Sequence, residues 1–532
     1  LAKIQGTDEY KKAANPTAFM QGLQQAYADY LANAQAANDI ANAGPDAAAA
    51  VANGSQDAAY KKNYAASYNT AQQALTDAIA GNQDNKPADS DSTCKQVYAK
   101  AQQQYSDAQK AMIEAANDTN NNPNNLDPTA YAAAQSAYNQ IVNDVQSGKK
   151  ESTNDSPFNT MSPLQQALYQ QQYDAIKAKY TAGQQSALSG SKATPTDRAE
   201  LAGYNAAKDG FNGANNTDPE NQSPAYIAGQ KAKSDSQDGI KQALQNASAQ
   251  SNPNDSDAKK DGLQAAKDAY AVVSGQQTPL TDDQLAQKSL AYQSAYKDAL
   301  NNAENTVTQA QNDYKNGSSA NKPQGSGVDA VAYNKAQSDA AQGATAAQNS
   351  TSATPDENET PSYKIGFNIA KGTADALNGA QKSNNNSDPE YKNAYDQATD
   401  GFNGANNTAP ENQTAAYKAG QQAKTDSQTG ADLATKGQSL PATPKPSQAE
   451  TDGFNATNDA YNDVQNGSTS LPDFTGKSLA YKDAYTNAFN AAKPVVSNAL
   501  SDYKNGSTDN KPADLNSAAG KAYKAVQDAA AQ

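Results

Sequence analysis

Apolar residues recur three or four positions apart along much of this chain, which is the spacing of one face of an α-helix. Between residues 59 and 80 this face is formed by Tyr60, Tyr64, Tyr68, Ala71, Leu75 and Ile79. Clusters of Asn, Asp, Gly and Pro separate such stretches and indicate turns. The pattern therefore predicts a chain of helices joined by polar turns.

The helical pattern repeats along the chain. The segment 288–323 returns almost unchanged as 477–512, a shift of 477 − 288 = 189 residues. A looser copy of the same helix, turn and helix occurs at 59–116. We therefore expect an all-α fold, an extended tandem array of short helical bundles or helical hairpins, with a repeat block of about 190 residues. The pattern does not choose between bundles and hairpins.

The repeat divides the chain into three parts. We expect divergent helical repeats in 1–162, a first full block in 163–354, and a second block, truncated at the C-terminus, in 355–532. In the first full block, helices are expected near 163–189, 198–214, 224–248, 258–274, 283–316 and 329–348.

Turn chemistry predicts several helix ends. Ser223-Pro224, Asp388-Pro389 and Thr278-Pro279 resemble N-caps followed by Pro in the first turn. Asn316-Gly317 and Asn466-Gly467 resemble left-handed C-caps, because glycine adopts positive φ without strain.

Large tyrosine rings alternate with small alanines on the helical faces. We interpret the regularly spaced rings as a structural seam between helices, formed by Tyr60, Tyr64, Tyr68, Tyr292, Tyr296, Leu300, Tyr481, Tyr485 and Phe489. Alanine lets helix axes approach, and tyrosine fills the gap while its hydroxyl stays near water or a carbonyl. The alternative interpretation is an exposed aromatic platform for sugars.

The absence of histidine restricts the chemistry. Without it, Ser-His-Asp and Cys-His arrangements and histidine metal sites cannot be built. Paired carboxylates could still cleave glycosides, but the chain also has no Trp for a sugar pocket. We expect no enzyme, no catalytic residues and no cofactor.

Two acidic loops, 84–91 and 252–257, carry oxygens that could hold Ca²⁺, yet neither has the spacing of an EF-hand. We interpret both as solvated turns and expect no metal site. Gly210 and Gly401 lie in polar helical context without a preceding strand, and we expect them to allow close helix approach. The single Cys94 is interpreted as incidental.

Asn-x-Ser/Thr triplets are frequent, for example at Asn215, Asn316, Asn406, Asn412 and Asn505. In a chain this rich in Asn, Ser and Thr, chance and turn chemistry explain most of them.

The formal net charge is −15, with Lys and Asp/Glu interspersed and few Arg residues. This argues against nucleic acid as a partner, because phosphate binding needs clustered positive charge. No run approaches the ~18 consecutive apolar residues of a membrane span, so we expect no membrane insertion in this segment. No signal-peptide pattern follows Leu1, and we expect a piece of a longer protein.

Short Ala-Tyr-Lys helices recur at 416–418, 480–482 and 522–524, separated by NGS and NKP turns. In this style and composition the whole chain resembles the long Ala/Tyr-rich helical repeat regions of secreted or cell-surface proteins of lactic acid bacteria. The resemblance implies an adhesin, aggregation factor or fibre and carries over no functional residues.

Together these features predict a non-enzymatic extracellular structural or adhesive repeat protein, acting as stalk, fibre or linker at the cell surface. The alternative is a repeat array of ligand-binding modules for host glycans or proteins. An intracellular helical scaffold is a third hypothesis. Expected partners are further copies of the chain, through self-association, and a host glycan or surface protein.

Overall fold

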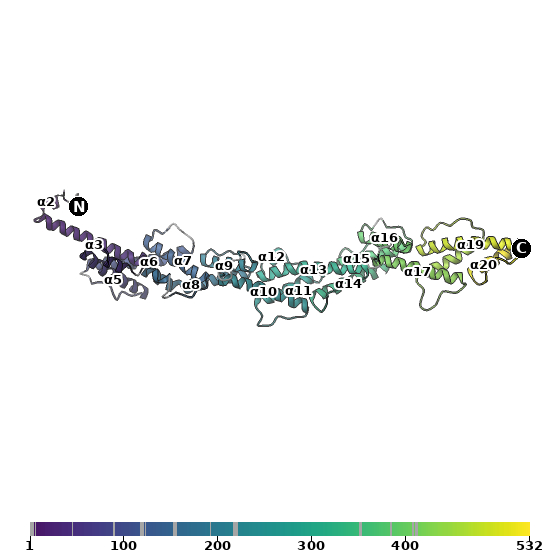
Figure 1. Cartoon of the computed structure of the whole chain (residues 1–532), viewed down its shortest axis with the longest axis horizontal. Helices are drawn as coiled ribbons and strands as arrows, with labels where there is room; N and C mark the ends of the chain where they lie inside the picture. Colours follow the sequence, from purple (N-terminus) through teal and green to yellow (C-terminus); the bar gives the residue numbers. More distant parts are fainter. Residues whose placement is uncertain are drawn as a thin grey trace. The chain divides into compact units, whose positions relative to one another are not determined.

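The computed structural model describes residue 5 and residues 7–532 apart from 45, 89–90, 118–121, 123, 153–156, 192, 216–221, 350–353, 384–385, 407–408 and 410–412. The chain is all-helical over these residues, without a β-strand among them (Figure 1). Contacts divide it into two units. The first comprises 1–239, 251–263 and 280–295, and the second comprises 240–250, 264–279 and 296–532.

The first unit contains α2 to α9, in which neighbouring helices pack in series. The bounds are α2 Asp8–Lys12, α3 Pro16–Asn42, α4 Ala47–Ala52, α5 Ala58–Ala80, α6 Ser92–Ala116, α7 Pro128–Gln146, the 3₁₀ helix η1 Phe158–Thr160, α8 Pro163–Leu188 and α9 Arg198–Asn212. The short α12, Asp282–Leu285, also belongs to this unit.

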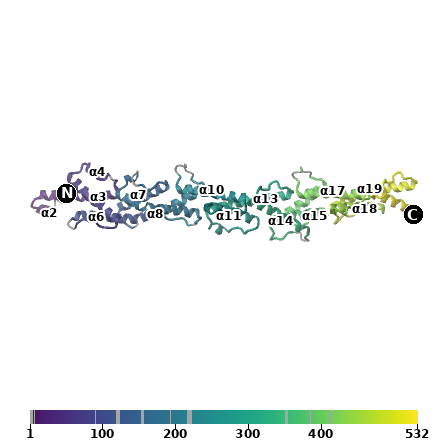
Figure 2. The same cartoon turned by 90° about the horizontal axis from the view of Figure 1, so that it is seen from below.

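The second unit contains α14 to α20, again with each helix packed on the next (Figure 2). The bounds are α14 Val328–Asn349, α15 Pro361–Leu377, α16 Pro389–Asn403, α17 Ala415–Thr435, α18 Gln448–Gln465, α19 Leu479–Asn505 and α20 Ala518–Ala530. The division between the units falls within α10 Pro224–Gln245, α11 Asp257–Val273 and α13 Leu290–Asn316.

Paired glycines mark where consecutive helices cross. A Cβ at Gly210 of α9 would collide with the Tyr226 carbonyl oxygen of α10, and one at Gly229 of α10 would collide with the Ala207 carbonyl oxygen of α9. From residue 207 to residue 210 of α9, the contacted position in α10 falls from 229 to 226. The α9 and α10 helices therefore run antiparallel, as expected both in helical hairpins and in short bundles.

The same crossing recurs one block later. Gly401 of α16 approaches the Tyr417 carbonyl, and Gly420 of α17 approaches the Ala398 carbonyl. The expectation that Gly210 and Gly401 allow close helix approach is confirmed, because the missing side chain lets the backbones touch.

Side-chain contacts repeat with the same shift. Lys233 lies over the Phe211 ring at 5.2 Å in the first unit, and Lys424 lies over the Phe402 ring at 5.1 Å in the second. The helical repeat is thus a repeat of packing as well as of sequence. The block limits at residues 162 and 354 stay predictions, because the division into units follows contacts and not repeats.

Most predicted helix ends are confirmed: α10 and α16 begin at Pro224 and Pro389, and Gly317 and Gly467 have positive φ. Two expectations were wrong. The expected helix 283–316 is divided at 286–289 into α12 and α13. Thr278-Pro279 does not start a helix, because Thr281 caps α12 in a reciprocal capping box with Gln284.

Candidate functional site

A recurring arrangement joins helix ends to the next helix. An aspartate lies four residues before a glycine of positive φ, and the residue after that glycine donates its N–H to the aspartate carbonyl. This is a Schellman motif, and aspartate occupies the position in eight helix ends, whereas Ser186, Ala271 and Leu433 occupy it before Gly190, Gly275 and Gly437. The pairs are Asp77–Gly81, Asp144–Gly148, Asp209–Gly213, Asp313–Gly317, Asp375–Gly379, Asp400–Gly404, Asp463–Gly467 and Asp502–Gly506.

An aspartate carboxylate at this position needs hydrogen-bond donors to offset its charge, because the helix C-terminus already carries partial negative charge. In most cases a tyrosine from a following helix donates its hydroxyl to the carboxylate. We call this contact the Asp–Tyr junction. The junctions are Tyr98–Asp77 at 2.5 Å, Tyr169–Asp144 at 2.9 Å, Tyr333–Asp313 at 2.6 Å, Tyr391–Asp375 at 2.8 Å, Tyr485–Asp463 at 2.5 Å and Tyr523–Asp502 at 2.7 Å.

Three junctions also include the NKP turn. Asn321 donates its backbone N–H and its side-chain amide to Asp313, each at 2.8 Å. Asn510 does the same to Asp502 at 2.9 and 2.8 Å, and Asn85 to Asp77 at 2.8 and 2.6 Å. Each of these aspartates is at most 2% exposed, so the asparagine and tyrosine hydrogen-bond donors stabilise its charge in place of water.

The hydrogen bonds change how the paired groups titrate. The Tyr523 hydroxyl, with Asn510 and Ser507, lowers the pKa of Asp502 to about 2. The Asp502 carboxylate in turn raises the pKa of Tyr523 to about 12. Burial alone would raise the pKa of Asp313, but donation from Tyr333 and its neighbours lowers it below the usual range. The junction therefore favours a charged aspartate beside a neutral tyrosine.

The sequence indicated the NKP turns, but the aspartates and their tyrosine partners were missed. The available signal was an aspartate eight residues before the NKP asparagine in every copy, at 77 and 85, 313 and 321, and 502 and 510. The tyrosine follows 20 or 21 residues after the aspartate, in the next helix.

The predicted seam residues are mostly enclosed. Tyr64, Tyr68, Tyr292, Tyr296, Tyr485 and Phe489 are buried, and Tyr60, Leu300 and Tyr481 are half-buried. The Tyr481, Tyr485 and Phe489 rings stack in succession, with centroids 6.0 and 5.9 Å apart. The seam assignment rested on ring packing alone, and the structure adds that Tyr485 is also a junction residue.

The hydroxyls of two N-terminal seam tyrosines bind polar side chains of α3. Tyr64 donates to Asp39 at 2.6 Å, and Tyr60 donates to Gln35 at 2.7 Å. The Tyr64–Asp39 hydrogen bond pairs the same two groups as an Asp–Tyr junction. It differs because Ala43, and not glycine, lies four residues after the aspartate at the end of α3.

A polar cleft of about 740 Å³ lies in the second unit beside Tyr481. It is lined by Asn378, Gln448, Asp452, Asn455, Asn458, Asp459, Gly476, Lys477, Ser478 and Tyr481. Its amides and carboxylates could bind vicinal hydroxyl groups. The Lys477 ammonium lies over the Tyr481 ring at 4.4 Å, so stacking of a sugar on this ring face requires the lysine to move aside.

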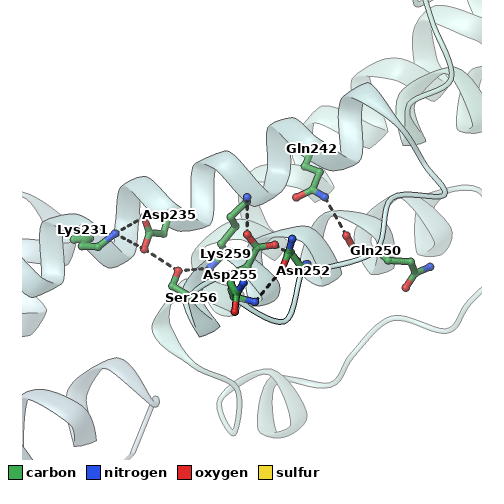
Figure 3. Close-up of polar contacts among 9 residues, drawn as sticks. Lys231, Asp235, Gln242, Gln250, Asn252, Asp255, Ser256 and Lys259 are labelled. Carbon is green, nitrogen blue, oxygen red and sulfur yellow. Dashed lines mark hydrogen bonds and ion pairs between the residues drawn. The ribbon is translucent and has the colours of Figure 1, made fainter.

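The acidic loop 252–257 is organised by caps and ion pairs (Figure 3). Asp255 accepts the Asn252 N–H and pairs with Lys259 at 2.8 Å, and this lysine lowers the pKa of Asp255. Ser256 donates to Asp235, which also binds Lys231. No group of three metal-binding side chains occurs among the described residues. In the other loop, residues 89 and 90 of 84–91 lie outside the described part.

The remaining candidates from the sequence are Cys94 and the asparagines of the Asn-x-Ser/Thr triplets. Burial raises the pKa of the Cys94 thiol, which lowers its reactivity at neutral pH. Asn215 and Asn406 adopt positive φ and donate to Asp209 and Asp400, each at 2.6 Å. Asn316 and Asn505 are the last residues of α13 and α19. Asn412 lies outside the described residues.

None of the described helices is both long enough and apolar enough to cross a membrane. The chain matches no protein-family model, no curated protein and no solved structure.

Proposed function

We propose that this chain is a non-enzymatic structural and adhesive repeat protein of the cell surface, acting as stalk, fibre or linker. The single observation that carries the proposal is the recurrence of the Asp–Tyr junction in both units. In each of these junctions a tyrosine–aspartate hydrogen bond attaches the end of one helix to a following helix. Such repetition suits a protein whose work is to hold spacing and bear load.

The extracellular location is supported by the acidic, amide-rich composition and by the resemblance to surface repeat proteins. The test is made in the source cell, where an antibody against the chain is applied to intact cells and deletion of the gene is followed by an aggregation assay. Surface labelling and reduced aggregation, restored by the wild-type gene, are expected. Labelling only after lysis, with unchanged aggregation, would refute the proposal.

Ligand binding is the second candidate, and the polar cleft beside Tyr481 favours it. A glycan of the host surface is the ligand class, because the lining presents amides and carboxylates beside an aromatic ring. The full chain is applied to a glycan array together with a Gln448→Ala/Asn455→Ala variant, both exposed side chains of α18. The matched control is Asn69→Ala, an exposed amide of α5.

Binding that is lost in the cleft variant and kept in the control supports this candidate. Absence of binding by the full chain, or equal binding by all three proteins, excludes the cleft as a glycan site.

A further inference from the structure

The helices α17, α18 and α19 repeat the arrangement of α10, α11 and α13. Ser236 of α10 and Ser427 of α17 each donate a 3.1 Å hydrogen bond, to a backbone carbonyl of α13 and of α19 respectively. Gly262 of α11 and Gly453 of α18 lie against the carbonyls of the same two serines. The two copies can therefore be compared position by position, with a shift of 427 − 236 = 191 residues for the first two helices and 480 − 291 = 189 for the third.

A cavity of about 270 Å³ in the second unit is lined by α17, α18 and α19. Its lining lies within residues 427–491, which the structure describes without a gap. Three lining positions carry smaller side chains than the other copy does: Ala431, Thr435 and Ala491 stand where α10 and α13 have Ile240, Leu244 and Asn302. Side chains lost from a packed position leave space that a ligand can fill. We call this space the Tyr461 cavity, lined among others by Ala431, Thr435, Tyr461, Ala488 and Ala491.

The cavity also contains a polar group without a partner. Tyr461 of α18 is only 6% exposed, and its hydroxyl has no hydrogen-bond partner among the described residues. In the other copy, burial raises the pKa of Tyr270, and a hydrogen bond with the Thr306 hydroxyl opposes this shift. Val495 stands at the position of Thr306, so the hydroxyl of Tyr461 has lost the corresponding bond. A buried hydroxyl of this kind is satisfied when a ligand supplies the hydrogen bond.

The charge of the lining differs between the copies as well. Asp432 stands where α10 has Lys241, and Asp483 stands where α13 has Ser294. The Asp483 carboxylate pairs with Lys424 at 2.6 Å. The Asp432 carboxylate is exposed and has no ion pair or hydrogen bond within the described part of the chain. A positively charged group is the complement of this unpaired carboxylate.

We propose that the Tyr461 cavity binds a branched aliphatic ammonium group. The aliphatic part fills the space that is left by the small side chains of Ala431 and Thr435. The ammonium group donates to the Tyr461 hydroxyl oxygen and interacts with the Asp432 carboxylate. The inference does not depend on the cellular location or on adhesion, so it can fail while the proposed structural role stands.

The test uses the full chain and isoamylamine, which carries a positive charge at neutral pH. Binding is followed by ligand-detected NMR titration, and a dissociation constant on the order of 1 mM is expected for so small a probe. Isoamyl alcohol has the same aliphatic body without the charge and is expected to bind about threefold more weakly or less.

Two sources offer this chemistry, a free branched amine and a peptide that begins with leucine. The tripeptide Leu-Gly-Gly is therefore titrated beside isoamylamine. Tighter binding of the amine identifies a small metabolite as the ligand, and tighter binding of the tripeptide identifies a peptide terminus.

Variants make the test specific. Ala431→Ile/Thr435→Leu fills the cavity with the residues of the other copy, so the fold is kept, and it is expected to weaken binding about tenfold or more. Tyr461→Phe and Asp432→Asn remove the hydroxyl and the charge, and each should weaken binding about threefold. Thr425→Leu, at an exposed threonine of α17 outside the cavity, is the matched control and should leave binding unchanged.

Three results would overturn the proposal. The first is no binding of isoamylamine or of the tripeptide at about 50 mM, which would mean that the cavity holds water only. The second is binding that is unchanged in the filled variant. The third is equal binding of the amine and the alcohol, since the charge is then not recognised.

Discussion

The Tyr333 hydroxyl donates a 2.6 Å hydrogen bond to the Asp313 carboxylate, and so ties α14 to the end of α13. The same carboxylate accepts two bonds from Asn321 in the connecting turn. One buried charge therefore fixes the helix end, the turn and the next helix. Leucine in place of the tyrosine could fill the space but could not satisfy the carboxylate.

Removal of a junction hydroxyl should loosen the helix that carries it. Tyr333→Phe is expected to lower the local free energy of opening of α14 by about 1.5 kcal/mol, because a hydrogen bond to a buried charge is lost. Hydrogen exchange of the α14 amides measures this. Tyr503→Phe, whose hydroxyl lies on an exposed ring, should change stability by less than about 0.5 kcal/mol. Equal effects of the two variants would contradict the assigned role.

The junction also predicts how stability depends on pH. The pKa of Asp502 is lowered to about 2, so its stabilising effect is complete above the unfolded value near 4 and is lost as pH falls toward 2. The pKa of Tyr523 is raised to about 12, so its effect is complete below 10 and is lost as pH rises toward 12.

Chemical denaturation of the full chain across this pH range, with exchange of the α20 amides as the local readout, tests both limbs. Tyr523→Phe should remove the alkaline loss at α20 and weaken the acid loss. An α20 stability that falls equally in wild type and variant between pH 10 and 12 would show that Tyr523 is not the titrating group.

The glycine crossings should not tolerate alanine. Gly210→Ala is expected to destabilise the α9–α10 hairpin by about 1–3 kcal/mol, because the new methyl group collides with the Tyr226 carbonyl. Gly22→Ala in α3 meets no atom within 4 Å and should stabilise its helix by about 0.5–1 kcal/mol. Thermal unfolding followed by circular dichroism compares the two. Stabilisation by both variants would mean that the helices do not cross at Gly210.

The Lys315–Glu390 pair should contribute modestly to the attachment of α16 to α13. Both side chains are partly exposed, and their contact is 2.5 Å. A double-mutant cycle with alanine at each position is expected to give a coupling energy of about 0.5–1 kcal/mol that decreases with added salt. A coupling energy of zero at low salt would contradict the contact.

Much of the fold follows from local sequence. Proline after a capping residue correctly predicted the start of α10 at Pro224, and Asn316-Gly317 correctly predicted the end of α13. Such ends are predictable because capping involves only residues close together in sequence. Thr278-Pro279 was misread, since Thr281 offers a better cap with Gln284 three residues later. The break before α13 was also missed, because the apolar spacing continues across it.

The junctions could not be predicted from local rules. Asp313 looks like an ordinary polar residue at an exposed helix end until α14 brings Tyr333 against it. The cleft beside Tyr481 likewise depends on the end of α15, where Gly379 lies against the Lys477 carbonyl. The junctions depend on how the next helix packs, and the cleft depends on helices distant in sequence, so spacing alone places neither.

We proposed that the Asp–Tyr junctions let this helical array bear load, and pulling a single full-length molecule from its two ends tests that proposal most directly. Wild type should unfold in a series of separate force steps, and the Tyr333→Phe/Tyr523→Phe variant should show lower forces for the steps that involve α14 and α20. Extension without force steps, or a variant with the same forces as wild type, would contradict that proposal.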